Sequence, residues 1–159
     1  MSHLEESQPR TFVVANETET DEFGARFAAI LEPNTVVALI GDLGAGKTRL
    51  VRAIAVGLGA DESMVNSPTF VLMQCYEGRL PVFHFDTYRL RDANEFDDLG
   101  PEEYFRSAGV CFVEWADRVE DSLPADHLRI QIEVVAETQR SFHITATGPK
   151  SGKALANLA

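Results

Sequence analysis

Apolar residues recur along the chain with the two spacings that distinguish helices from strands. In residues 23–31 they fall at i, i+4, i+7 and i+8, which is one face of a helix that Thr18 or Thr20 could cap. A helical stripe also recurs in residues 48–59, and two short helices are predicted in the acidic segment 88–109. Each of these helices has an apolar face that needs a sheet to pack against.

Two apolar runs, at residues 35–40 and 110–115, predict strands that are buried on both faces. The runs at residues 70–76 and 82–86 are close enough to form an antiparallel hairpin.

Strict alternation of apolar and polar residues marks two further strands, at residues 128–134 and 141–148. They predict an antiparallel C-terminal hairpin at the edge of the sheet, with one face in water. The expected architecture is therefore an α/β fold, in which helices cover both faces of a mixed sheet.

The ends of the chain lack these patterns. We expect a flexible N-terminal tail at residues 1–10, one domain at residues 11–148, and a mobile C-terminal tail at residues 149–159. The start has no basic region followed by an apolar run, and no window approaches 18 apolar residues, so neither secretion nor membrane insertion is expected.

The composition narrows the function classes. The 159 residues carry a net charge of −11, which argues against strong autonomous binding to tRNA or any other polyanion. The two cysteines form no C-x-x-C pair and the four histidines show no metal-ligand spacing, so no structural zinc is expected. A reduced cytoplasmic location fits best.

A glycine-rich segment between a predicted strand and a predicted helix carries the chemistry. Residues 41–48 have the sequence GDLGAGKT, which fits the P-loop pattern G-x-x-x-x-G-K-[ST] and predicts a three-layer, P-loop NTPase-like fold. The assigned nucleotide-binding residues are Gly41, Asp42, Leu43, Gly44, Ala45, Gly46, Lys47 and Thr48. Backbone N–H groups of such a loop surround phosphate oxygens, and small residues leave room for them. Lys47 supplies charge to the β- and γ-phosphates, and the Thr48 hydroxyl can bind Mg²⁺.

Two carboxylates at predicted strand ends complete the expected site. Asp86 ends VFHFD and Glu114 ends VCFVE, where one acid would hold hydrated Mg²⁺ and the other would orient or deprotonate the attacking water. The pattern leaves open which acid has which role. His84 shares a strand face with Asp86 and is assigned a structural role.

Three other features have two interpretations each. Trp115 is assigned to the core, with a contact to nucleotide or a partner as the alternative. Thr69, in the segment SPTF, is a candidate sensor of the γ-phosphate, and a plain Ser-Pro turn is the alternative. The acidic segment 95–103 is either a solvated surface or a docking surface for a partner.

In their order and spacing, GDLGAGKT, SPTF, HFDTYRL, LG-x-x-E-Y and VEW resemble the TsaE (YjeE) family of small bacterial ATPases. The resemblance implies a P-loop protein that binds ATP with Mg²⁺. It also implies a role in making N6-threonylcarbamoyladenosine in tRNA, in support of TsaD and TsaB, where TsaD carries the transfer chemistry.

The resemblance also assigns roles by position. It makes Thr48 the direct metal ligand, Glu114 the metal-site acid, and Asp86 the acid near the γ-phosphate and its water. More loosely, Glu17, Gln139 and Arg140 match regions that approach the adenine.

The chain departs from the family pattern at three places. Arg49 replaces a second threonine, Thr87 replaces a leucine, and Ala116-Asp117 replaces Pro-Glu, but none of these changes removes a catalytic group.

Two other function classes remain open at this stage. A small-molecule kinase would use the same loop but needs an acceptor pocket and an arginine-bearing lid, for which Arg89 and Arg91 are the only close pair. A nucleotide-gated binding module with negligible turnover differs from an ATPase only in rate.

Overall fold

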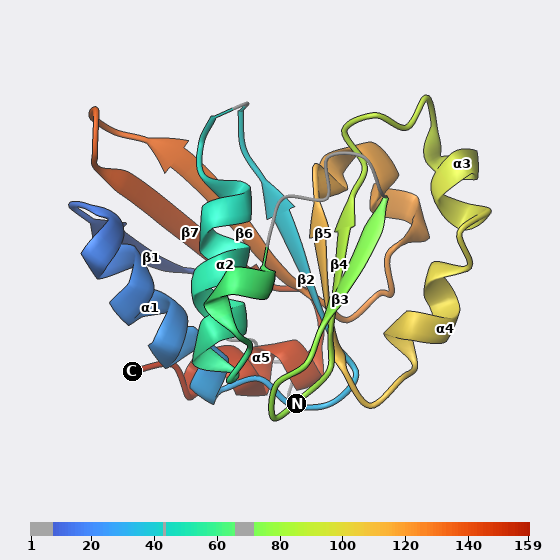
Figure 1. Ribbon diagram of the computed structural model, residues 1–159, viewed down its shortest axis with the longest axis horizontal. Helices are drawn as coiled ribbons and strands as arrows, with labels where there is room; N and C mark the ends of the chain where they lie inside the picture. The colour runs from blue at the N-terminus through green and yellow to red at the C-terminus, as the bar shows by residue number, and fades with distance from the viewer. Residues whose placement is uncertain (1–7, 43, 66–71) are drawn as a thin grey trace.

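The computed structural model describes residues 8–42, 44–65 and 72–159, and within these residues the strands form one sheet (Figure 1). The strands are β1 (Arg10–Val14), β2 (Thr35–Ile40), β3 (Met73–Tyr76), β4 (Val82–Asp86), β5 (Val110–Glu114), β6 (Leu128–Val134) and β7 (Arg140–Ala146). Their order is β1-β7-β6-β2-β5-β4-β3. Neighbours among β4, β5, β2 and β6 run parallel, whereas β3, β7 and β1 pair antiparallel with their neighbours.

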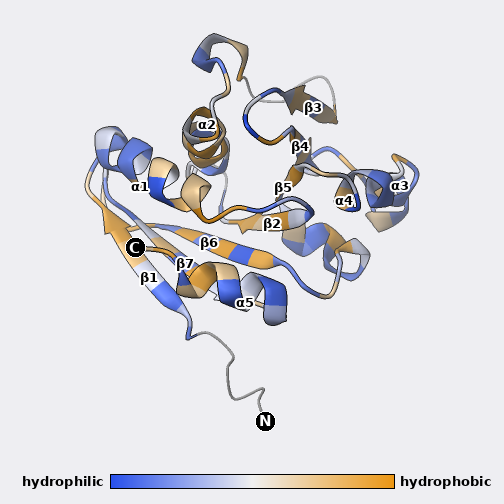
Figure 2. Cartoon of the chain, turned by 90° about the horizontal axis from the view of Figure 1, so that it is seen from below, coloured by the Kyte–Doolittle hydropathy of each residue, from blue (hydrophilic) through white to orange (hydrophobic). Residues whose placement is uncertain are grey.

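Helices cover both faces of this sheet (Figure 2). They are α1 (Glu17–Ala29), α2 (Lys47–Gly57), α3 (Ala93–Asp97), α4 (Pro101–Phe105) and α5 (Pro149–Ala156), with 3-10 turns η2 (Glu62–Met64) and η3 (Ala116–Ser122). None of the helices in the described part of the chain is long and apolar enough to cross a lipid bilayer.

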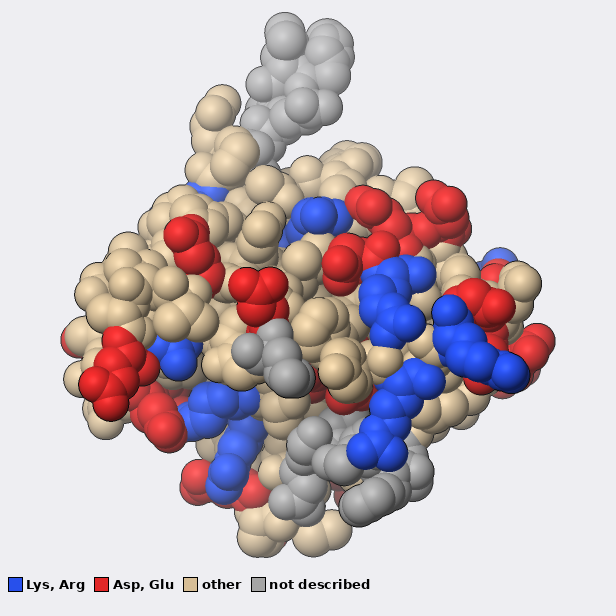
Figure 3. Space-filling model, turned by 90° about the horizontal axis from the view of Figure 1, so that it is seen from above, with Lys and Arg blue, Asp and Glu red and all other residues tan. Residues whose placement is uncertain are grey.

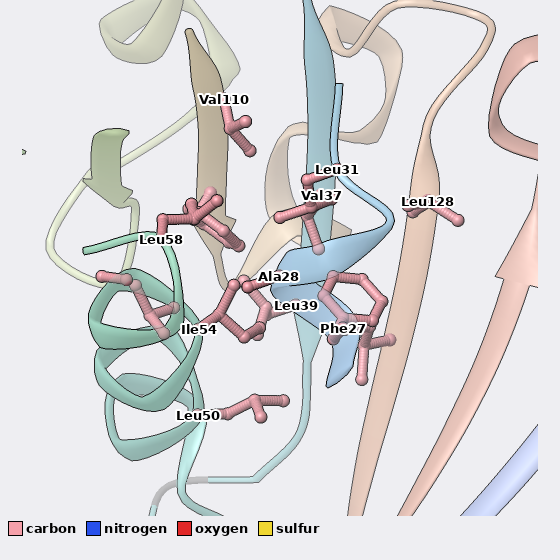
Figure 4. Packing of buried hydrophobic residues seen from close by; sticks show 14 of the residues in the cluster. Phe27, Ala28, Leu31, Val37, Leu39, Leu50, Ile54, Leu58, Val110 and Leu128 are labelled. Atoms are coloured by element: carbon pink, nitrogen blue, oxygen red, sulfur yellow. The ribbon is translucent and has the colours of Figure 1, made fainter. Parts of the chain in front are cut away.

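The central strand β2 separates two apolar cores. Val37 and Leu39 pack in one core with residues of α1 and α2, including Phe27 and Ile54 (Figure 4). Their neighbours on β2 point to the opposite side and pack with α3, α4 and η3. This alternation makes β2 a strand buried on both faces. The predicted α/β architecture is therefore confirmed.

Helix α1 begins earlier than its apolar stripe. Asn16 is the N-cap, because its side chain accepts a hydrogen bond of 2.9 Å from the backbone N–H of Glu19. The Glu19 carboxylate in turn accepts from the backbone N–H of Ala15 at 2.7 Å. The predicted caps, Thr18 and Thr20, are therefore wrong, since both lie inside the helix. The spacing N-x-x-E, typical of a capping box, was the missed signal.

The C-terminal hairpin lies inside the sheet rather than at its edge. Its strand β6 pairs with β2, and its other strand β7 pairs with β1. The edge position was wrong because β1 was not predicted. Residues 10–14 supply the missing edge strand, in which Phe12 and Val14 contact the apolar core.

The C-terminal segment is part of the domain, which corrects the expectation of a tail at residues 149–159. Residues 149–156 form α5, and the side chains of Leu155 and Leu158 are buried. The Asp126 carboxylate accepts hydrogen bonds from the first turn, at 2.8 Å from Lys150 N and 3.0 Å from Ser151 N. Arg10 of β1 donates to the carbonyl of Leu158. Partners distant in the sequence therefore fix both ends of this segment.

Replacing Leu155 by alanine should lower the free energy of unfolding by about 2–5 kcal/mol, because a fully buried leucine leaves a cavity when it is truncated. Urea unfolding followed by circular dichroism measures the change. Lys153→Ala, at an exposed position of the same helix, is the matched control and should change stability by less than about 0.5 kcal/mol. Equal stability of the Leu155 variant and the wild type would mean that α5 does not contribute to the folded domain.

Candidate functional site

Three strands and one loop converge at one end of the sheet. The loop between β2 and α2 follows the carboxyl end of β2, and parallel pairing brings Asp86 of β4 directly beside Glu114 of β5. Here lies a cavity of about 280 Å³, lined by Gly44, Gly46, Lys47, Thr48, Arg49, Asp86, Tyr88, Glu114 and Trp115. Figure 3 shows this end of the molecule, where acidic and basic side chains are interspersed.

The loop needs glycine at different positions for different structural reasons. Gly44 and Gly46 have φ angles of 83° and 103°, and a Cβ at either would have no heavy atom within 4 Å. They permit left-handed backbone on the open side of the loop. Gly41 instead allows close packing, since a Cβ there would lie 2.9 Å from the carbonyl oxygen of Ile132.

Lys47 is held over the loop rather than extended into solvent. Its Nζ donates hydrogen bonds to the carbonyls of Gly41 at 2.7 Å and Asp42 at 2.9 Å, and lies 3.9 Å from the centroid of the Trp115 ring. Burial lowers the pKa of Lys47, against the opposing effect of nearby carboxylates, first Glu114. A cation held this way is positioned for an anion entering the cavity.

Glu114 connects β5 to the start of α2. The Thr48 hydroxyl lies 2.9 Å from Oε1 and 2.8 Å from Oε2 of Glu114, and His84 Nε2 contacts Oε2 from the other side. Glu114 is buried. A hydroxyl and a carboxylate are oxygen ligands of the kind that Mg²⁺ uses, usually one or two from the protein together with phosphates and water. These two residues therefore fit a magnesium ion, and Asp86 lies beside them.

Asp86 has a different environment from Glu114. It is half-buried, and its carboxylate accepts a hydrogen bond of 2.9 Å from the backbone N–H of Tyr88. Burial raises the pKa of Asp86, and the negative charge of Glu114 adds to the increase. A carboxylate with a raised pKa is a better proton acceptor than an exposed one.

Trp115 lies on the wall of the cavity and not in the core, which corrects the assignment made from the sequence. Its backbone is left-handed, with φ of 58°, a conformation that bulky residues seldom adopt. Its ring lies 4.9 Å from the ring of Tyr88, and its carbonyl accepts from the Thr87 hydroxyl at 2.9 Å. Strained backbone of this kind is concentrated at functional sites.

Thr87 and Tyr88 are site residues that the sequence analysis missed. The Thr87 hydroxyl contacts the carbonyls of both Glu114 and Trp115, which ties the end of β4 to the end of β5. The only signal was the departure from the family pattern at Thr87. A change from leucine to a hydroxyl residue next to Asp86 could have suggested this link.

The residues matched to an adenine site are near the loop but do not line the cavity. Arg140 Nε donates to the carbonyl of Ala45 at 3.1 Å, and its Nη1 contacts carbonyls of the turn 136–139. Glu17 pairs with Arg49 at 3.0 Å. The roles of Glu17, Gln139 and Arg140 at adenine stay predictions. Leu43 and Thr69 lie outside the described residues.

Comparisons with known proteins identify the family of this chain. Residues 14–142 match the family described as threonylcarbamoyl adenosine biosynthesis protein TsaE. The chain belongs to the TsaE family. A TsaE protein of Bacillus subtilis (strain 168) is 44% identical over 134 residues, which is 84% of this chain and 83% of that protein. One of Treponema pallidum (strain Nichols) is 40% identical over 126 residues, covering 79% of this chain and 93% of that protein.

A solved structure supports the fold as well as the family. The crystal structure of YdiB from Bacillus subtilis matches with a TM-score of 0.80 and 34% identity, over 95% of this chain and 94% of that chain. The TsaE match at residues 14–142 spans every candidate site residue from Glu17 to Arg140, whereas α5 lies beyond it.

Proposed function

We propose that this chain binds ATP with Mg²⁺, hydrolyses it slowly, and thereby supports N6-threonylcarbamoyladenosine modification of tRNA together with TsaD and TsaB. The observation that carries the proposal is the convergence of Lys47, Thr48, Glu114 and Asp86 on one cavity. Membership of the TsaE family supplies the biological process.

Each site residue has a separate role in phosphoryl transfer to water. Lys47 and the backbone N–H groups of residues 44–48 bind the phosphates, while Thr48 and Glu114 would hold Mg²⁺. When bound, the metal neutralises charge on the phosphate oxygens. Asp86 orients the attacking water and accepts its proton as the O–P bond forms and ADP leaves. This assignment follows the buried position of Glu114 and the raised pKa of Asp86.

Slow turnover is expected because the described part of the cavity lining offers no unpaired arginine to the transferring phosphoryl group. Arg49 is the arginine among the described residues that line the cavity, and its guanidinium is paired with Glu17 at 3.0 Å and with Asp21 at 2.7 Å. It is therefore already neutralised and not placed to stabilise the transferring phosphoryl group. In P-loop enzymes a partner can supply such a charge and raise the rate by several orders of magnitude.

An acidic surface offers a docking place for that partner. Asp97 and Asp98 are exposed at the end of α3, and Glu102 and Glu103 are exposed on α4. Glu95, in contrast, accepts hydrogen bonds from the backbone N–H and the side chain of Arg91, at 2.7 Å and 3.0 Å. It stabilises the start of α3 and is left out of the test.

We expect turnover below about 1 s⁻¹ for the chain alone and a clear increase when TsaD and TsaB are added. The double variant Asp97→Lys, Asp98→Lys should reduce this increase and leave the ATP affinity of the free chain unchanged. Steady-state phosphate release measures turnover, and calorimetry measures affinity. Glu22→Lys with Glu32→Lys, at exposed positions near α1, makes the same charge change as a control.

Fast hydrolysis that is indifferent to TsaD and TsaB would contradict the proposal and favour a self-sufficient kinase. An equal loss of stimulation in both charge variants would place the docking surface elsewhere.

A further inference from the structure

His84 has no role in the steps described above, although it is the most deeply buried titratable side chain near the site. It lies on β4 with a relative exposure of 0%. Its Nε2 contacts Oε2 of Glu114, and its Nδ1 lies 3.1 Å from the hydroxyl of Tyr76 on β3. Both polar atoms of the ring are therefore used, and they link two different strands.

The contacts continue on both sides of His84. The Tyr76 hydroxyl donates to Oε1 of Gln74 at 2.8 Å, and the same hydroxyl lies 3.1 Å from Nδ1 of His84. At the other end, the Thr48 hydroxyl contacts both oxygens of Glu114. The result is one hydrogen-bonded chain from Gln74 through Tyr76, His84 and Glu114 to Thr48.

Packing alone does not explain a histidine at this position. A buried polar ring is costly unless its nitrogen atoms have partners, and the neighbouring Val82 and Phe112 show that an apolar side chain suits the same core. Thr48 has one hydroxyl hydrogen for the two oxygens of Glu114, which leaves the orientation of the carboxylate underdetermined. A second contact at Oε2 fixes it.

We propose that His84 is a positioning residue, which holds the Glu114 carboxylate in the orientation that it needs beside Thr48 to bind Mg²⁺, and that Tyr76 and Gln74 hold the His84 ring. The inference rests on the proposed Mg²⁺-dependent binding of ATP. Groups that orient a metal ligand typically change metal affinity about 10-fold to 100-fold when they are removed.

The test measures ATP affinity by calorimetry over a series of Mg²⁺ concentrations and in EDTA. We define the Mg²⁺ requirement as the Mg²⁺ concentration that gives half of the maximal increase in ATP affinity. His84→Leu should raise this requirement by about 10-fold to 100-fold and leave the ATP affinity in EDTA unchanged. His84→Gln, which can place an amide nitrogen near Glu114, should recover most of the loss. Tyr76→Phe should shift the Mg²⁺ requirement in the same direction by a smaller factor.

Val82→Ala is the matched control for a purely structural role. Val82 lies on the same face of β4 as His84 and packs in the apolar core, but its side chain makes no hydrogen bond. Its truncation should lower the melting temperature and leave the Mg²⁺ requirement at the wild-type value. A folded His84→Leu protein with the wild-type Mg²⁺ requirement overturns the inference. If His84→Leu does not fold, a wild-type requirement in Tyr76→Phe overturns it instead.

Glu114→Gln separates this inference from the proposed function. If the wild type itself binds ATP equally well with Mg²⁺ and in EDTA, the proposed function fails. If Glu114→Gln loses the Mg²⁺ dependence while the His84 and Tyr76 variants keep it, only the positioning role fails.

Discussion

Replacing Lys47 by alanine should weaken ATP binding by about 100-fold or more and leave the domain folded. Hydrogen bonds to charged groups contribute about 1.5–3 kcal/mol each, and about 1.4 kcal/mol corresponds to a tenfold change in affinity. The Lys47 ammonium makes two such bonds to carbonyls of its own loop, and these are replaceable by phosphate oxygens. Calorimetric titration with ATP and Mg²⁺ measures the loss.

Lys153→Ala is the control for Lys47→Ala, since it removes the same charge from an exposed position on α5. It should bind ATP as the wild type does. An unchanged affinity in Lys47→Ala, with the melting temperature of the wild type, would remove the basis for assigning residues 41–48 as a P-loop.

Replacing Asp86 by asparagine should slow ATP hydrolysis by about 100-fold to 10,000-fold, while ATP affinity changes only a few-fold. Removal of a positioned proton acceptor typically has an effect of this size. The amide keeps the shape of the side chain and its acceptor oxygen for the Tyr88 N–H, so the fold is preserved. Single-turnover hydrolysis and calorimetry on the same preparation separate the rate from the affinity.

Asp121→Asn is the control, because Asp121 is exposed on η3 and lies outside the cavity lining. It should hydrolyse ATP at the wild-type rate. Since only the ionised Asp86 accepts a proton and its pKa is raised, the wild-type rate should fall with decreasing pH sooner than an exposed aspartate would predict. A loss of Mg²⁺-dependent binding in Asp86→Asn, equal to its loss of rate, would instead exchange the roles of Asp86 and Glu114.

The sequence was sufficient to predict the elements of the fold that are defined by a local pattern of apolar and polar residues. The bounds of β2 and β4 were predicted as they occur, because continuous apolar runs flanked by turn residues define them. Asp86 and Glu114 were predicted to serve one site because a nucleotide-hydrolysing site needs carboxylates at strand ends, and the parallel pairing of β4 with β5 places them side by side.

The features that could not be predicted from the sequence depend on contacts between residues that are distant along the chain. Helix α5 offers only a short apolar face, and its burial is decided by Arg10 and by the cap from Asp126. The role of His84 depends on Tyr76 and Glu114, which lie on two other strands. Propensity and periodicity describe neighbours in sequence, and they contain no information about such pairs.

The pairing of the first described strand with the last one has a consequence for how the protein is made. Among the described strands, β1 pairs only with β7, and Arg10 binds the carbonyl of Leu158, which is 148 positions away. During synthesis β1 therefore remains unpaired, with one face of Phe12 and Val14 uncovered, until β7 has left the ribosome. Contacts between residues this far apart in the sequence form late and slowly, because the conformational entropy of the intervening chain is lost before the contact forms. Newly made chains should depend on chaperones most in this interval, when their edge is open to pairing with other strands.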